Sequence, residues 1–370
     1  MGWCPMLDTS PMFCINEKCI DYNKTGLNNI GPRGKYGKNK DRNLFGCRTC
    51  GKRFAETHNT AYFGLHCSQD LIRQIVHHAA EGVSVRATAR LLSCDKNKIN
   101  RVILKAGEHI MLVLSYLLRS LHMTEVQLDE LWSFVQKKKS DEEDIGEHWI
   151  WTAVDAKTKL MISFMVGHRT LEDARKFLKD LTSRWDVPPL LTSDALPHYQ
   201  TVIGELYSDF ETPERTGLPG RPKGPIQVIH ENIDYATVTK TMEGGKVVQV
   251  TRQIVFGTEG SIQKRLENSP SVTINTSYVE RMNLSLRLWD AHLSRKSVTF
   301  AKALPWLTAK LAIVIGAYNF VRPHETLSRG KDRKFRDKSP AMAAGITDRI
   351  WSYPDLLWFR PLYQANQVVA

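Results

Sequence analysis

The stretch MTEVQLDELWSFV, residues 123–135, mixes alternating and apolar positions as an interior β-strand does, and it carries Asp129 and Glu130. Neighbouring side chains of a strand point to opposite faces, so Glu130 is expected to face away from Asp129 and ranks second as a functional acid. The next apolar stretch, HWIWTAVDAKTKLMISFMVG (148–167), predicts two strands joined by a turn at Asp155–Lys159. Residues 123–167 are thus expected to form the first three strands of a sheet.

A helix and another strand follow this hairpin. TLEDARKFLKDLTSRW (170–185) has helical periodicity, and PLLTSDALPHY (189–199) predicts a short apolar strand that stops at Asp194. Strand, hairpin, helix and strand in this order predict a mixed α/β sheet with flanking helices. Ligands of such sheets gather at strand ends, which is where Asp194 is expected to lie, with Asp129 on the first strand.

A third acid opens the stretch SYVERMNLSLRLWDAHLSRKSVTFAK (277–302). Glu280, Asn283 and Arg287 are spaced i, i+3 and i+7, so a helix places them on one face. Three carboxylates from separate elements can hold two divalent metal ions about 4 Å apart for in-line displacement at a phosphodiester. Ordinary structural acids at strand ends are the alternative interpretation of the same residues.

Charge is distributed unevenly along the chain, whose formal net charge is +12. Residues 1–120 carry 18 basic against 9 acidic residues, residues 281–340 carry 13 against 4, and the remainder carries 20 against 26. Basic flanks favour a phosphate backbone as partner, and an acidic centre favours divalent cations. Generic solvated charge is the alternative.

The segment between the second and third acids is long, since Asp194 and Glu280 are 280 − 194 = 86 residues apart. It contains a Pro/Gly-rich stretch, TPERTGLPGRPKGP (212–225), and then alternating residues around Glu243–Gly245, which signal a hairpin. Residues 205–275 are therefore expected to form a β-rich insertion, whose role is a second DNA contact or a dimer surface.

Four of the seven cysteines form two tight pairs, CINEKC and GCRTCGKRF. This spacing predicts a Cys4 zinc ribbon with a hairpin between the pairs, and Gly51 suits a turn that needs a positive φ. A redox dithiol at the second pair is the alternative, although it leaves the first pair unexplained. The predicted zinc ligands are Cys14, Cys19, Cys47 and Cys50. The basic loop between the pairs is expected to contact DNA through Arg33, Lys35, Lys38, Lys40 and Arg42.

Residues 68–110 read as consecutive helices. The first is expected to end at Gly82, Ser84 to cap the second, and a turn at Ser93–Asp95 to lead into a basic third helix. This order is typical of a helix-turn-helix, whose last helix enters the major groove; a small helical linker with a solvated basic face is the alternative. The expected DNA contacts of the third helix are Lys96, Lys98, Asn100, Arg101 and Lys105.

Membrane and secretory features are not apparent in the sequence. The apolar runs 110–118 and 311–321 are short enough to read as buried helices, and the N-terminus lacks a basic start followed by an apolar block. An intracellular, reducing location without a membrane partner is expected. A basic stretch (328–338) and an aromatic one (351–363) form the C-terminal tail.

The chain resembles DDE transposases of bacterial insertion sequences, specifically the Insertion Sequence One family in its single-chain form. The likeness spans roughly residues 14–330, and the motifs that carry it are CINEKC…CRTCGKRF, SVRATARLL, VQLDELWSFV, VGHRT, TSDALPHY, YVERMNLSLR, LSRKSVTFAK and YNFVRPHETL. It departs from many DDE enzymes in the long gap between its second and third acids.

The resemblance implies an RNase H-like catalytic domain with two Mg²⁺ or Mn²⁺ ions, beside one structural Zn²⁺. It assigns the catalytic acids to Asp129, Asp194 and Glu280, with Arg287 and Asn283 as the motif's basic residue and asparagine. Arg295 and Lys296 join the expected DNA contacts. The expected domains are a zinc ribbon (1–60), a helix-turn-helix domain (61–120), an RNase H-like DDE domain (121–330, including 205–275) and a basic, aromatic tail (331–370).

The implied activity is transposition: binding of an element's terminal inverted repeats, metal-dependent 3′-end cleavage, and strand transfer into target DNA by at least a dimer. Two alternatives remain open at this point. One is a metal-dependent nuclease or resolvase that never joins strands. The other is a non-catalytic zinc and helix-turn-helix DNA-binding protein with purely structural acids.

Overall fold

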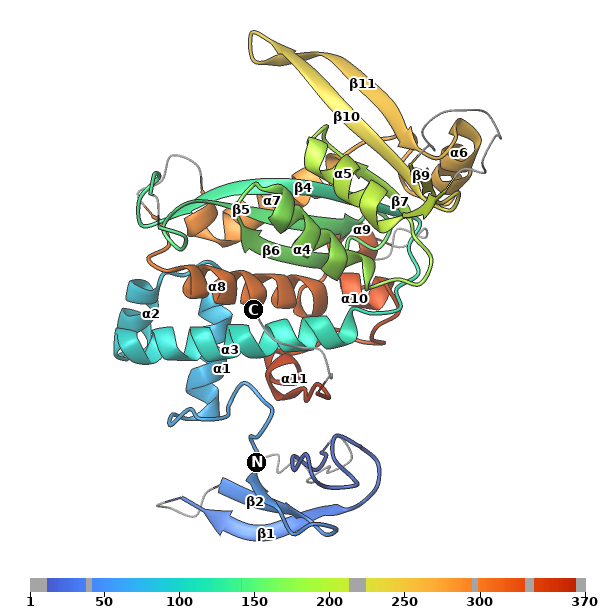
Figure 1. Ribbon diagram of the computed structural model, residues 1–370. Helices are drawn as coiled ribbons and strands as arrows, with labels where there is room; N and C mark the ends of the chain where they lie inside the picture. The colour runs from blue at the N-terminus through green and yellow to red at the C-terminus, as the bar shows by residue number, and fades with distance from the viewer. Residues whose placement is uncertain are drawn as a thin grey trace. The chain divides into compact units, whose positions relative to one another are not determined.

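The computed structural model describes residues 12–37, 42–140, 142–212, 224–294, 299–329 and 336–363 (Figure 1). The chain divides into two compact units. The first contains the described residues up to Ala79, then Val83–Leu117 and those from Trp351 onward. The second contains Ala80–Gly82 and Leu118–Ile350.

A small antiparallel sheet, in the order β1-β2-β3, lies in the first unit. Its strands are β1 (Ile30–Tyr36), β2 (Arg42–Cys47) and β3 (Arg53–Ala55). Phe45 is fully buried beneath it, together with Cys14, Cys19 and Cys47, whereas Cys50 is exposed. The hairpin predicted between the two cysteine pairs is therefore present as β1 and β2.

Three helices follow in the first unit: α1 (Gln69–Ala80), α2 (Val85–Leu91) and α3 (Lys96–Leu117). Ser84 caps α2 by accepting a hydrogen bond from the Ala87 N–H, as its position in the sequence predicts. Gly82 and Ser93 take positive φ values of 76° and 45° in the turns before α2 and α3. Local turn chemistry therefore determines this helix, turn, helix succession.

The C-terminal segment completes the core of the first unit. Helix α11 (Tyr353–Trp358) lies on α3, with the Trp358 ring 4.7 Å from that of Tyr62. Arg360 donates a hydrogen bond of 2.7 Å to the Glu56 carbonyl. The stretch expected as one tail is thus divided, since α10 (Pro340–Ala343) belongs to the second unit.

The second unit is built on a six-stranded mixed sheet in the order β11-β10-β7-β4-β5-β6. Strands β4, β5 and β6 form an antiparallel meander, while β7 runs parallel to both β4 and β10. The bounds are β4 (Glu125–Val135), β5 (Gly146–Asp155), β6 (Met161–Gly167), β7 (Leu190–Ser193), β10 (Asp234–Glu243) and β11 (Lys246–Phe256). The predicted mixed sheet with flanking helices is confirmed, and it is compatible with an RNase H-like domain.

Adjacent residues of β5 show how helices cover the two faces. Trp151 packs against Phe177 of α4 (Leu171–Thr182) and Tyr199 of α5 (Pro197–Leu206), whereas Thr152 bonds to Asn283 of α7 (Ser277–Trp289). Helices α4 and α5 therefore lie on one face and α7 on the other (Figure 1).

Residues 205–275 are rich in strands, as expected, but only some of these strands are separate from the main sheet. Strands β8 (Ser208–Glu211) and β9 (Ile226–Ile229) pair separately, followed later by α6 (Glu259–Glu267). The predicted hairpin consists of β10 and β11 with positive φ at both turn glycines, and β10 belongs to the central sheet through its pairing with β7.

Helical elements η1 (Ala291–Leu293), α8 (Leu304–Gly316), η2 (Ala317–Val321) and α9 (Glu325–Ser328) complete the unit. The stretch Leu304–Ser328 has the length and composition of a membrane span, yet 72% of its apolar window is buried. Asn319 within it bonds to both backbone groups of Met161, at 3.1 and 2.9 Å. These features are those of a core helix.

Candidate functional sites

Two predicted acids meet at one edge of the large sheet. The pairing of β7 with β4 stops at Thr192 and Gln127, so Asp129 lies just beyond it, where Asp194 follows the end of β7. One carboxylate oxygen each from Asp129, Glu130 and Asp194 lies within 4.8 Å of the others. The cluster therefore contains two of the three predicted acids and adds Glu130.

Asp129 is held from the α7 side. Its Oδ2 accepts a hydrogen bond of 2.7 Å from Asn283 Nδ2, and the amide oxygen of Asn283 accepts one of 3.1 Å from Thr152. Asn283 is only 2% exposed, so these two hydrogen bonds are shielded from water. Burial raises the pKa of Asp129 to about 6, helped by the charges of Asp194 and Glu280 and opposed by the Asn283 hydrogen bond.

Glu130 joins the cluster from the other face. It pairs with Trp151, which faces α4 and α5, whereas Asp129 pairs with Thr152, which faces α7. The expected opposite orientation is therefore found, but both carboxylates reach the open end of β7. Burial, together with the charge of Asp194, raises the pKa of Glu130 to about 7. Its Oε1 is buried and has no hydrogen-bond partner within the described part of the chain.

Arg169 is a site residue that the sequence motifs did not single out by role. Its Nη2 lies 3.1 Å from Glu130 Oε2 and 3.6 Å from Asp194 Oδ2, and its guanidinium lies 4.7 Å from the centre of the Trp149 ring. The residue follows β6, which runs parallel to β4 and ends at the same edge. The sequence feature that could have indicated a role for Arg169 is its position directly after that strand.

Glu280 opens α7, as predicted, but its carboxylate has other partners. Thr276 Oγ1 donates to it at 2.5 Å and Lys240 Nζ lies 2.5 Å away. Glu280 is not among the acids within 4.8 Å of one another in the described chain, although its charge raises the pKa of Asp129. Arg287, half-buried, lies in the last turn of the same helix.

The acidic site fits a divalent cation. Hard cations such as Mg²⁺ bind carboxylate oxygens, and the cluster offers one from each of its three acids. A cation would also offset the burial and the like-charge repulsion that raise the pKa of Asp129 and Glu130.

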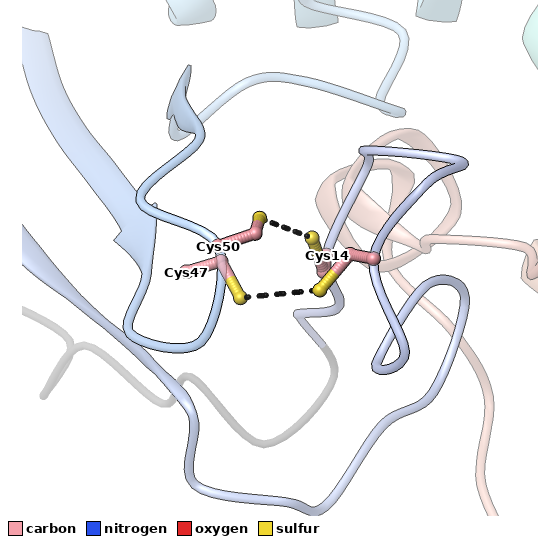
Figure 2. A group of neighbouring side chains, drawn as sticks. Cys14, Cys47 and Cys50 are labelled. Atoms are coloured by element: carbon pink, nitrogen blue, oxygen red, sulfur yellow. Dashed lines mark hydrogen bonds between the residues drawn. The ribbon is translucent and has the colours of Figure 1, made fainter.

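Four cysteines form a second candidate metal centre in the first unit. The sulfurs of Cys14 and Cys50 are 3.5 Å apart, those of Cys19 and Cys47 are 4.0 Å apart, and all four lie within 4.8 Å (Figure 2). A tetrahedral Zn²⁺ with four thiolates separates its sulfurs by about 3.8 Å. The predicted ligand set therefore fits zinc.

Backbone geometry supports the second cysteine pair. Gly51 has φ of 74°, as the turn requires, and its N–H bonds to the Cys47 carbonyl at 2.9 Å. The Lys52 N–H is the largest influence on Cys50, and it lowers the pKa of that thiol to about 6. This thiol is thus prepared to ligate as the thiolate.

The predicted DNA contacts lie mainly on the surface of the first unit. Exposed side chains are those of Arg33, Lys35, Lys96, Lys98, Arg101 and Lys105, whereas Arg42 and Asn100 are half-buried. Arg101 also donates to the Gly64 carbonyl at 3.0 Å and Lys105 pairs with Glu108 at 2.8 Å. Four further expected contacts lie outside the described residues: Lys38, Lys40, Arg295 and Lys296.

Comparison with known proteins finds a family match for part of the sheet domain. A family model described as IS1 transposase matches residues 123–208, a range that includes Asp129, Glu130, Arg169 and Asp194. This segment is therefore similar to IS1 transposases. The IS1 relationship expected from the motifs is confirmed.

A curated relative supports the same family. The insertion element iso-IS1n protein InsB of Shigella dysenteriae is 39% identical over 56 residues, which are 15% of this chain. The match covers 38% of the relative's length. The IS1 match ends before Glu280, whose charge nevertheless raises the pKa of Asp129.

Proposed function

We propose that the protein is a DNA transposase that binds the terminal inverted repeats of an insertion sequence, cleaves at 3′ ends and transfers the strand to target DNA. The observation that carries the proposal is the meeting of Asp129 and Asp194 at one sheet edge, inside the segment that matches the IS1 family. Asn283 of α7 orients Asp129 from the other side.

In this proposal Asp129, Asp194 and Glu280 hold two Mg²⁺ or Mn²⁺ ions, with Glu130 as a further ligand. Bound divalent ions supply activation of the attacking hydroxyl and stabilisation of the leaving oxygen. Asn283 keeps the Asp129 carboxylate turned toward the site, and Arg287 binds substrate phosphate. The acids stay unmodified, so no covalent protein–DNA intermediate arises.

The remaining parts bind DNA. We propose that the zinc ribbon (1–60) and the helix-turn-helix domain (61–120) contact the element's ends, while residues 121–330 carry the chemistry and 331–370 form the basic, aromatic tail. At least two copies act together, since two ends must be cut and joined. DNA-bound protein in a prokaryotic cytoplasm is the corresponding location.

A strand-transfer assay tests the proposal. The wild type, incubated with Mg²⁺ and a duplex carrying the DNA that borders the gene, should join a 3′ end to a target plasmid. Asp129→Ala should abolish cleavage and joining yet bind the duplex normally. Cleavage without joining would indicate a nuclease, and unchanged behaviour of Asp129→Ala would indicate a DNA-binding protein with structural acids.

A further inference from the structure

Two basic side chains contact the carboxylates of the candidate active site. Both belong to parts of the chain that carry none of the acids. Arg169 follows β6 and contacts Glu130 and Asp194 at 3.1 and 3.6 Å. Lys240 lies on β10 and contacts Glu280 at 2.5 Å. Each acid proposed to bind metal thus has a basic neighbour or, for Asp129, an amide donor.

The fold holds Arg169 in place without closing the site. Its guanidinium stacks on the Trp149 ring at 4.7 Å, and its partner Glu130 has a side chain only 1% exposed. The Arg169 side chain itself is 37% exposed. The ion pair is therefore shielded on the Glu130 side and open to solvent on the other, where a larger ligand would approach.

Lys240 reaches the site because β10 continues beyond β7. The parallel pairing of the two strands ends at Thr237 and Ser193, directly before Asp194. Lys240 lies further along this free stretch, where it pairs with Val250 of β11, and its side chain extends to Glu280 of α7. The Lys240 side chain is also 37% exposed.

Divalent ions would compete with the side chains of Arg169 and Lys240 for the same carboxylates. Asp129, Glu130, Asp194 and Glu280 bring four negative charges when ionised, of which Arg169 and Lys240 balance two. Mg²⁺ or Mn²⁺ coordination uses carboxylate lone pairs that now accept from Nη2 and Nζ. Metal bound at Glu130 Oε2 or Glu280 Oε1 would therefore compete with Arg169 and Lys240, whose side chains remain tethered at the rim of the site when displaced.

We propose that Arg169 and Lys240 are exchangeable counter-ions: they hold the carboxylates before metal binds, and once displaced they bind the phosphate oxygens of the DNA strand that reacts. Arginine matches phosphate in a bidentate manner, and lysine acts as a point charge. The phosphates of a DNA strand would replace the carboxylates as anionic partners of the displaced side chains. The inference rests on the proposed metal-dependent activity and gives two further residues a direct contact with the substrate.

The role predicts effects of opposite sign on metal affinity and on rate. Arg169→Gln and Lys240→Met remove a competitor of the metal, so Mn²⁺ should bind the DNA-free protein about two- to ten-fold more tightly. The same substitutions remove a phosphate contact, so nicking of a supercoiled plasmid at saturating Mn²⁺ should slow about 10- to 1,000-fold. A residue that merely supports the fold would weaken both.

The experiment measures Mn²⁺ binding by electron paramagnetic resonance at about pH 8, and then plasmid nicking, with the full chain. Arg175→Gln is the matched control for Arg169, since Arg175 is an exposed arginine of α4 paired with Glu205 at 2.7 Å. Lys179→Met, at an exposed lysine of α4, is the control for Lys240. Both controls should leave Mn²⁺ affinity and nicking as in the wild type.

Weaker or unchanged Mn²⁺ binding in both Arg169→Gln and Lys240→Met would overturn the inference, as would tighter binding with unchanged nicking. Circular dichroism of each variant separates misfolding from a local effect, and Arg169→Lys, which keeps the charge, should recover part of the nicking rate. Failure of the proposed function looks different. In that case the wild type itself would show no Mn²⁺ site that Asp129→Ala removes.

Discussion

Asp129 and Glu130 are neighbours in sequence whose carboxylates reach one site from opposite faces of a strand. Alternation along β4 predicts their opposite orientation, and this is what the pairing with Thr152 and Trp151 shows. It does not predict that β7 ends beside them and leaves both carboxylates access to Asp194. Strand length, a property of the assembled sheet, decides that.

Asn283 has the clearest individual role. Asn283→Ala removes the donor to Asp129 and leaves Thr152 without its amide partner, so metal-dependent nicking should fall about 10- to 100-fold with DNA affinity unchanged. Steady-state rates and a filter-binding isotherm measure the two effects. Ser285→Ala on the same helix is the control. An equal loss of DNA affinity would mean that Asn283 contacts DNA instead.

The buried acids predict a pH dependence of the metal-free protein. The folded-state pKa of Glu130, about 7, is above its ordinary value of 4.5, and that of Asp129, about 6, is above 3.8. Between these values the folded state keeps protons that the unfolded state has lost, so stability falls as pH rises from about 4 to about 7. Mg²⁺, which needs ionised ligands, should raise the melting temperature more at about pH 8 than at about pH 5.

Glu130→Gln tests this assignment, because glutamine cannot ionise. Its melting temperature should fall less than that of the wild type across the same pH range, by the equivalent of about 1–3 kcal/mol at the upper end. The exposed Glu142→Gln serves as the control. Parallel curves for Glu130→Gln and the wild type would mean that Glu130 ionises normally.

At the scale of elements, short polar signals predict the boundaries well. Ser84 caps α2, Gly51 turns the second cysteine pair, and two glycines join β10 to β11, each by a local interaction that a sequence reveals. Lys240 shows the limit of such signals. Its partner Glu280 is forty residues away, and only the pairing of β10 with β7 brings it near.

The cysteine cluster predicts that the ribbon depends on metal. Cys47→Ser removes one of four thiolates from a small sheet with little other core, so zinc content should fall from about one per chain toward zero and the ribbon should unfold. Elemental analysis and proteolysis of the first unit measure this. Cys94→Ser, outside the cluster, is the control. Protein that folds and binds DNA fully without zinc would contradict the assignment.

At the scale of the molecule, sequence order and spatial order differ. The segment from Trp351 packs with the first unit, although about 230 residues of the second unit separate it from Leu117. The aromatic composition of this segment is apparent in the sequence, but nothing local predicts its partners, Tyr62 and Tyr116. Periodicity likewise reveals β10 as a strand without revealing that it belongs to the central sheet.

The proposed DNA binding should depend strongly on salt. With +12 per chain, affinity should fall steeply with salt, by a slope of about −0.9 for each phosphate neutralised. Lys98→Ala, on the exposed face of α3, should reduce that slope by about 1. Lys157→Ala, in the turn between β5 and β6, should leave it unchanged. Binding isotherms at several salt concentrations measure these slopes. Identical slopes for the wild type and both variants would mean that α3 is not part of the DNA interface.

The placement of Mn²⁺ in crystals of the full chain tests the metal-binding site most directly. Anomalous scattering should locate Mn²⁺ in coordination contact with both Asp129 and Asp194, with Glu130 or Glu280 completing the ligands and Arg169 and Lys240 moved away from them. Mn²⁺ bound elsewhere, with Asp129 and Asp194 free of it at saturating concentration, would contradict the account.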